Sequence, residues 1–125
     1  MVLLVLSRSA AAQREPVQHE RSAVSSESRF EIVQSTIVAR STYRIDKFTG
    51  RIDLMVMRAD SSLRWQPMPR REHPSGDTRV AGRANYQVFV SGIANRHTYL
   101  INTNNGATWQ LVLTKDEELV WDPIF

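Results

Sequence analysis

The chain has 125 residues and a mass of 14.3 kDa, enough for one ordinary domain or two very small ones. Apolar residues make up 42% and charged residues 23%, so a core can form, and the net charge is +3. The chain has no cysteine, which excludes disulfide scaffolds, Cys-ligated zinc, iron–sulfur clusters and thiol catalysis. No apolar run approaches the ~20 residues of a membrane-spanning helix, so no membrane span is expected.

Residues 1–12 have the pattern of the back half of a secretory signal, because an apolar run at residues 2–6 is followed by three alanines. The run is shorter than the ~7–15 residues of a complete signal, and no basic residue precedes it. We therefore expect a truncated signal peptide and a periplasmic or secreted protein. The alternative is a cytoplasmic chain with a frayed N-terminus. Residues 13–28 are polar and aperiodic, which predicts a disordered spacer.

An internal duplication is the strongest signal in the sequence. A shift of 56 residues aligns residues 30–68 with residues 86–124 without a gap, and 12 of the 39 positions are identical. Each copy ends in a Trp-x-Pro sequence, which begins at Trp65 and at Trp121. Self-similarity at a fixed period is the signature of a repeat architecture. The first repeat spans residues 29–68 and the second spans residues 85–125.

Each repeat predicts four short antiparallel strands, because apolar residues alternate at period two between turn signals. Phe30 and Ile32, for example, fall on one face of the first strand. No part of the repeats shows the 3.6-residue apolar period of an amphipathic helix, so the expected fold class is all-β. The expected strands are residues 29–35, 42–46, 51–58 and 63–67, and residues 85–91, 98–102, 107–114 and 119–123.

The second and third strands of each repeat should form a hairpin. Its turn begins with Asp46 or Asn102, whose side chain can accept a hydrogen bond from the turn backbone. Four residues later, Gly50 or Gly106 can take the positive φ of a type I turn with a G1 bulge. The repeated glycines are therefore expected to be structural rather than ligand-contacting.

Residues 69–84, between the repeats, contain two prolines, two glycines and four arginines. This composition predicts a linker or a long exposed loop. Two four-stranded units are too few to close a ring by themselves, and a single repeat exposes its apolar face until a neighbour covers it. The two repeats are therefore expected to pack together as a small sandwich or barrel. The alternative is a ring assembled from several chains.

The first hairpin also carries a family resemblance. The sequence Tyr-Arg-Ile-Asp-Lys-Phe-Thr-Gly, which begins at Tyr43, resembles the Y-x-L-D-x-x-T-G hairpin of small exported bacterial β-repeat proteins. It is also similar to the D-x-x-T-G hairpin in the blades of quinoprotein-type β-propellers. The propeller pattern has Trp four residues after the glycine, where this chain has Leu54 and Gln110. No cofactor-binding residue of the quinoproteins maps onto the chain, so no cofactor is expected.

The tryptophans are the candidates for ligand stacking. Trp65 and Trp121 occupy equivalent positions, which favours a structural role in the core, since both repeats need the same packing. Trp109 aligns instead with the charged Asp53, so we expect it at a solvent-leaning position where a ligand could stack. Other residues of the same hairpin would contribute to this ligand site: Tyr99, Asn102 and Asn104. The alternative is that Trp109 only covers a neighbouring sheet.

The remaining patterns favour a protein that is not an enzyme. The three histidines lack metal-ligand spacing, and no nucleophile elbow or Gly-rich phosphate loop is present, so neither a metal site nor a catalytic residue is expected. Residues 29–84 carry a charge of +5 and residues 85–125 carry −2, so the repeats could attract each other. The arginines are spread rather than clustered, which argues against nucleic acid.

These features together predict a binding or assembly module of the bacterial envelope. Its partner would be another protein or a second copy of the chain. A lectin-like module that binds a glycan is the alternative, and a small hydrolase is a more distant one.

Overall fold

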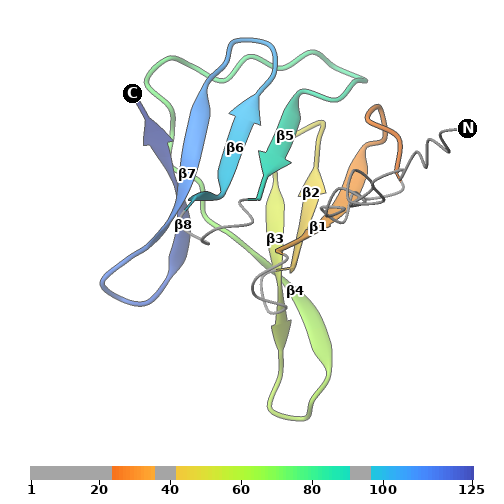
Figure 1. Cartoon of the computed structure of the whole chain (residues 1–125), viewed down its shortest axis with the longest axis vertical. Helices are drawn as coiled ribbons and strands as arrows, with labels where there is room; N and C mark the ends of the chain where they lie inside the picture. The colour runs from red at the N-terminus through yellow and green to blue at the C-terminus, as the bar shows by residue number, and fades with distance from the viewer. Residues whose placement is uncertain (1–23, 36–41, 91–96) are drawn as a thin grey trace, which may run out of the picture.

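The computed structural model describes residues 24–35, 42–90 and 97–125, which form two four-stranded antiparallel sheets (Figure 1). All elements in these ranges are strands, so the expected all-β class is confirmed. Each strand begins and ends within two residues of its expected bounds. The first sheet has the order β1 (Phe30–Gln34), β2 (Thr42–Asp46), β3 (Ile52–Met57) and β4 (Leu63–Pro67). The second has the order β5 (Tyr86–Phe89), β6 (Tyr99–Asn102), β7 (Thr108–Leu113) and β8 (Leu119–Ile124).

The β2–β3 and β6–β7 turns have the expected geometry. The Asp46 carboxylate accepts a hydrogen bond from the backbone N–H two residues later at 3.0 Å, and the Asn102 side-chain oxygen does the same at 2.9 Å. Gly50 and Gly106 both have φ of 76° and close the two turns with equal 2.8 Å backbone bonds. The equal geometry indicates that the local sequence determines this turn in both repeats.

The core lies between one face of each sheet. In the first sheet, Tyr43 and Ile45 on β2 and Ile52 on β3 are almost completely buried. We call this side the inner face of the first sheet. Its three residues pack in one cluster with buried residues of the second sheet: Tyr86, Leu100, Trp109, Leu111 and Trp121. We call the side that bears these residues the inner face of the second sheet. The packing is sandwich-like, and the described strands do not close into a barrel.

The two sheets bury opposite faces of the same repeat. Residues directly opposite each other in a ladder share a face, so Leu100 and Trp109 lie together on the inner face of the second sheet. Their repeat equivalents, Arg44 and Asp53, are also opposite each other, but on the face of the first sheet that points away from the core. The first repeat therefore packs one side against the second repeat and leaves the other side open.

The linker is largely exposed, as expected, but two short parts of it are anchored to the second sheet. Arg70 forms a parallel bridge with Trp121, and the backbone of residues 69–71 exchanges hydrogen bonds of 2.9 and 3.0 Å with that residue. His73 is buried, with its Nε2 3.1 Å from the carbonyl oxygen of Ile124. The linker thus covers the edge of β8, where unpaired backbone groups would otherwise be available to another chain.

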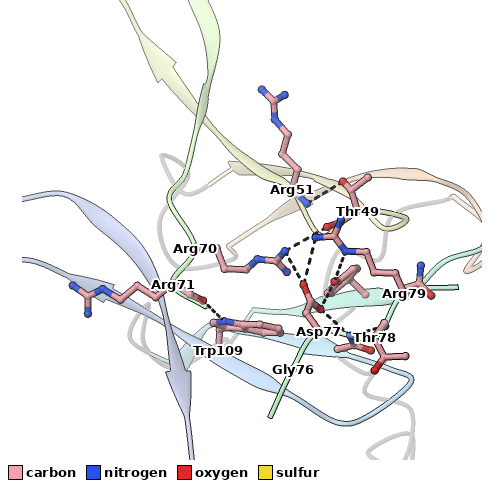
Figure 2. A network of polar contacts seen from close by, with 12 residues as sticks. Thr49, Arg51, Arg70, Arg71, Gly76, Asp77, Thr78, Arg79 and Trp109 are labelled. Atoms are coloured by element: carbon pink, nitrogen blue, oxygen red, sulfur yellow. Dashed lines mark hydrogen bonds and ion pairs between the residues drawn. The ribbon is translucent and has the colours of Figure 1, made fainter. Parts of the chain in front are cut away.

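Asp77 is the second anchor of the linker (Figure 2). Its carboxylate accepts hydrogen bonds from the hydroxyl of Tyr86 and from Asn102 Nδ2, and forms ion pairs with Arg70 at 3.1 Å and Arg79 at 3.4 Å. Partial burial raises the pKa of Asp77, but these hydrogen bonds and the two guanidinium groups lower it by more, so its net pKa lies below the usual value. Burial and the bond to Asp77 raise the pKa of Tyr86.

The guanidinium of Arg70 lies between two aromatic rings, 5.1 Å from the centroid of Tyr86 and 4.9 Å from that of Trp109. Tyr86 and Trp109 both belong to the core cluster, so the linker is connected to the core through cation–π contacts as well as ion pairs. This polar network has a structural explanation, since each of its charged groups stabilises the junction between the linker and the second sheet.

Candidate functional site

The candidate site is the side of the first sheet that points away from the core, which we call the open face. Its side chains come from all four strands: Phe30, Ile32, Arg44, Asp53, Met55, Leu63 and Trp65. Phe30 and Ile32 are each 53% exposed and Leu63 is 59% exposed. An apolar patch of this kind on a small protein is more often an interaction surface than an accident of folding.

A charged cluster lies in the middle of the open face. Asp53 is buried, and its carboxylate accepts hydrogen bonds from Arg44 Nη2 at 2.7 Å and from Arg51 Nε at 3.2 Å. The Arg44 guanidinium also lies 4.8 Å from the ring centroid of Trp65, on the next strand but one. The two arginine side chains are partly exposed, whereas the carboxylate is not, so the cluster presents positive charge at the surface.

A shallow pocket of about 200 Å³ opens beside this cluster and is lined by Phe30, Arg44, Asp46, Arg51 and Asp53. Arg29 forms an ion pair of 3.0 Å with Asp46 at the pocket's edge. Burial raises the pKa of Asp46, but its hydrogen bonds to Arg29 and to the turn backbone outweigh burial and lower the net pKa.

Both carboxylates that line the pocket are held in ion pairs with arginines, Asp46 with Arg29 and Asp53 with Arg44. Within the described ranges, no three potential metal ligands come together. The open face instead combines aromatic, Met and Arg side chains, the residue types that are enriched in the cores of protein–protein interfaces.

The sequence-based ligand site differs from this surface. Trp109 is 1% exposed and belongs to the core, so the expectation that it occupies a solvent-leaning position is wrong. The physical reason is visible in its aligned residue: Asp53 is buried as well, so neither repeat leaves this position in solvent. The alternative, that Trp109 covers a neighbouring sheet, agrees with its packing in the cluster. Its indole N–H donates to the carbonyl oxygen of Arg71 at 2.8 Å.

The other three residues of that expected site do not gather around a free surface. Asn102 is buried and donates to the linker at Asp77 and Thr78. Asn104 lies in the turn and donates to Thr78 and Asn85. Tyr99 is opposite Gln110, on the other side of the second sheet from Trp109. A ligand role for these residues has no support from their arrangement.

The two aligned tryptophans have different environments. Trp121 is 1% exposed and part of the core, whereas Trp65 is only partly buried on the open face beneath Arg44. Tyr43 is buried in the core. Sequence reasoning did not single out Arg44 or Phe30 as site residues. The available signal was that Arg44 and Asp53 change together to Leu100 and Trp109 between the repeats.

Comparisons of the chain with family models, with curated proteins and with solved structures found no match. The described ranges contain no helix that is long and apolar enough to cross a bilayer.

Proposed function

We propose that the chain is a non-enzymatic binding or assembly module that recognises a protein through the open face. The observation that carries the proposal is the exposure of Phe30, Ile32 and Leu63 around the Arg44–Trp65 contact. An aromatic and aliphatic patch with a central arginine provides desolvation energy and directional hydrogen bonds in one place. The pairing of Asp53 with two arginines avoids the cost of leaving a buried carboxylate without a partner.

A protein partner has more support than a glycan. The ring of Trp109 is buried, and one face of Trp65 is occupied by the guanidinium of Arg44. Stacking on a sugar requires an aromatic face that is free in the unbound protein. The open face instead surrounds a charged cluster with exposed apolar side chains, a combination that is typical of protein–protein interfaces.

Site-specific photo-cross-linking tests this proposal. A benzophenone amino acid replaces Phe30 on the open face of the full chain. The variant is expressed in bacterial cells, which are then illuminated. The matched control carries the same amino acid at Val80, an exposed apolar residue of the linker. We expect a cross-linked protein product from position 30 and none from position 80. Equal products from both positions, or none from position 30, would overturn the proposal.

We also propose that the module acts outside the cytoplasm. The support is the apolar and small-residue pattern of residues 1–12, which lie outside the described residues. Fractionation of bacterial cells that produce the protein from its native gene, with any residues encoded before Met1, tests this when it is followed by N-terminal sequencing of the recovered protein. A chain in the periplasm that has lost residues 1–12 is the expected result, and an intact chain confined to the cytoplasm contradicts it.

A further inference from the structure

We propose that the partner of the open face is a second copy of this chain, which binds through the exposed side of its second sheet. This inference rests on the proposed assembly function, because it names the partner. The interface would be head-to-tail, with the first repeat of one copy against the second repeat of the next. Its geometry follows from the contact between the two repeats within one chain.

The intramolecular contact joins two different faces of the repeat. The first repeat contributes the side that bears Tyr43 and Ile45, and the second contributes the opposite side, which bears Tyr86 and Leu100. Each repeat therefore has one face of each kind, but each uses only one of them within the chain. The unused faces are the open face of the first repeat and the side of the second sheet that bears Tyr99. We call the latter side the tail face.

The tail face has apolar side chains at exposed positions. Phe89 is 61% exposed and stacks on Tyr99, with ring centroids 6.4 Å apart. Ile101 is partly exposed, and Ile124 is 39% exposed. Tyr99, Ile101 and Ile124 align with Tyr43, Ile45 and Met68, which are packed in or against the core. The second repeat therefore retains the kind of surface that the first repeat buries.

The two unused faces differ from the buried ones in a coordinated way. Where the inner face of the first sheet has Ile52 and Leu54, the tail face has Thr108 and Gln110. The opposing surface changes in the same direction, since Leu100 and Trp109 on the inner face are replaced by Arg44 and Asp53 on the open face. Within the chain, the apolar pair Ile52 and Leu54 packs in the same core as the apolar pair Leu100 and Trp109. Between chains, the polar pair on the tail face would meet the charged pair on the open face. Such matching is expected if both surfaces belong to one interface.

The turn glycines show the same relation. Within the chain, a Cβ at Gly50 would lie only 2.9 Å from the ring of Tyr86, so this turn packs directly on that aromatic ring. The equivalent turn at Gly106 has no atom within 4 Å of its Cβ position. The residue equivalent to Tyr86 is Phe30, which is 53% exposed. In the head-to-tail complex, Phe30 of one copy would pack against the Gly106 turn of the next.

Charge favours the same pairing. The first repeat, residues 29–68, carries a net charge of +3, and the second, residues 85–125, carries −2. Head-to-tail contact brings the basic repeat of one copy to the acidic repeat of another, whereas contact between two open faces would bring like charges together. A head-to-tail interface is heterologous, so it forms a ring if the rotation between copies closes and a filament if it does not.

The test uses two charged variants of the full chain and their mixture. Ile32→Asp changes only the open face, where the new carboxylate would lie opposite Arg44, and Phe89→Asp changes only the tail face. Each variant keeps the face that the other has lost. Light scattering at two protein concentrations measures the mass of each sample. Val80→Asp in the linker is the matched control, because it also replaces an exposed apolar residue with a carboxylate.

We expect the parent chain and Val80→Asp to form multi-chain species, and each face variant to associate at least about tenfold more weakly. An equal mixture of the two variants should form a 1:1 dimer and nothing larger, because only one intact open face meets one intact tail face. If either variant alone associates like the parent, or if the mixture stays monomeric, the head-to-tail interface is wrong.

Two further observations keep the outcome decisive. Near-ultraviolet circular dichroism verifies that the variants are folded, and Leu63→Lys with Ile124→Lys provides a second pair on the same two faces. A parent chain that is monomeric when purified, yet cross-links in cells to a different protein through position 30, overturns this inference and leaves the proposed function intact. A parent chain that is monomeric when purified and forms no cross-link in cells overturns both.

Discussion

The two repeats have nearly the same strands, the same turns and 12 identical residues, yet they bury opposite faces. Trp121 is in the core, and its equivalent Trp65 is on a surface. Leu100 and Trp109 pack in the core, whereas their equivalents Arg44 and Asp53 lie on the open face. The comparison shows that the local sequence determines the strands and turns, whereas burial depends on which face of each repeat contacts the other repeat. The aligned pairs therefore provide matched experiments.

The largest difference in the free energy of unfolding is expected between alanine variants of the two tryptophans. Trp121→Ala should lower the free energy of unfolding by about 3–5 kcal/mol, because it removes a completely buried aromatic side chain and leaves a cavity. Trp65→Ala should cost roughly 1 kcal/mol, since it loses partial burial and the contact with Arg44. Urea unfolding of both variants measures the difference. Equal losses would mean that Trp65 is buried in solution, as it would be beneath a partner.

The two turn glycines should differ by a smaller amount. Gly50→Ala and Gly106→Ala both place a side chain at φ of 76°, which costs about 1–2 kcal/mol in each case. Gly50→Ala must also displace the guanidinium of Arg70 and the ring of Tyr86, which adds roughly 1–3 kcal/mol of overpacking. Thermal or urea unfolding of monomeric protein at low concentration compares the two. Equal destabilisation would contradict the packing of the first turn on the second repeat.

The linker gives a third difference, because its partly buried carboxylate, Asp77, accepts hydrogen bonds from Tyr86 and Asn102 of the second sheet. Asp77→Asn should cost about 2 kcal/mol at neutral pH, since Tyr86 and Arg70 lose a charged acceptor. The pKa of Asp77 is lowered in the folded chain, so its contribution is complete above its unfolded pKa of about 3.9 and is lost as the pH falls through the folded value.

Urea unfolding between pH 7 and pH 2 checks this pH dependence. The parent should lose stability below pH 4 more steeply than Asp77→Asn does. Glu72→Gln, which neutralises an exposed carboxylate of the same linker, controls for the loss of one negative charge. Parallel acid profiles for the parent and Asp77→Asn would mean that the network in Figure 2 does not form in solution.

Most of the fold could be predicted from the sequence because its determinants are local. Period-two alternation defined the strands, and an Asx residue followed by glycine defined the turns. Burial was harder to predict, because both faces of each repeat contain apolar residues. Alternation shows that Tyr43 and Arg44 lie on opposite faces, but it does not show which face meets the other repeat.

The misplaced ligand site has the same origin. The charge of Asp53 predicts solvent at its position and at the equivalent position of Trp109, yet Asp53 is buried because two arginines satisfy its carboxylate. One of them, Arg44, is its cross-strand neighbour, and the other, Arg51, precedes it by two residues on the chain. A buried ion pair has the same sequence composition as an exposed one, so only the three-dimensional arrangement distinguishes them.

The smallest effect on stability, and the sharpest test of the comparison, is expected from making the open face resemble the buried one. Arg44→Leu/Asp53→Leu removes both members of the closest ion pair together and leaves only Arg51, whose side chain is 62% exposed, without its carboxylate. Because Arg51 can be solvated, the free energy of unfolding should change by no more than about 1 kcal/mol. Head-to-tail association should nevertheless weaken, because Thr108 and Gln110 on the tail face would meet an apolar surface. Light scattering and urea unfolding of the double variant separate the two effects. Unchanged association would show that the paired polar substitutions between the repeats do not belong to one interface. A large loss of stability would show that the charged cluster contributes to the fold rather than to recognition.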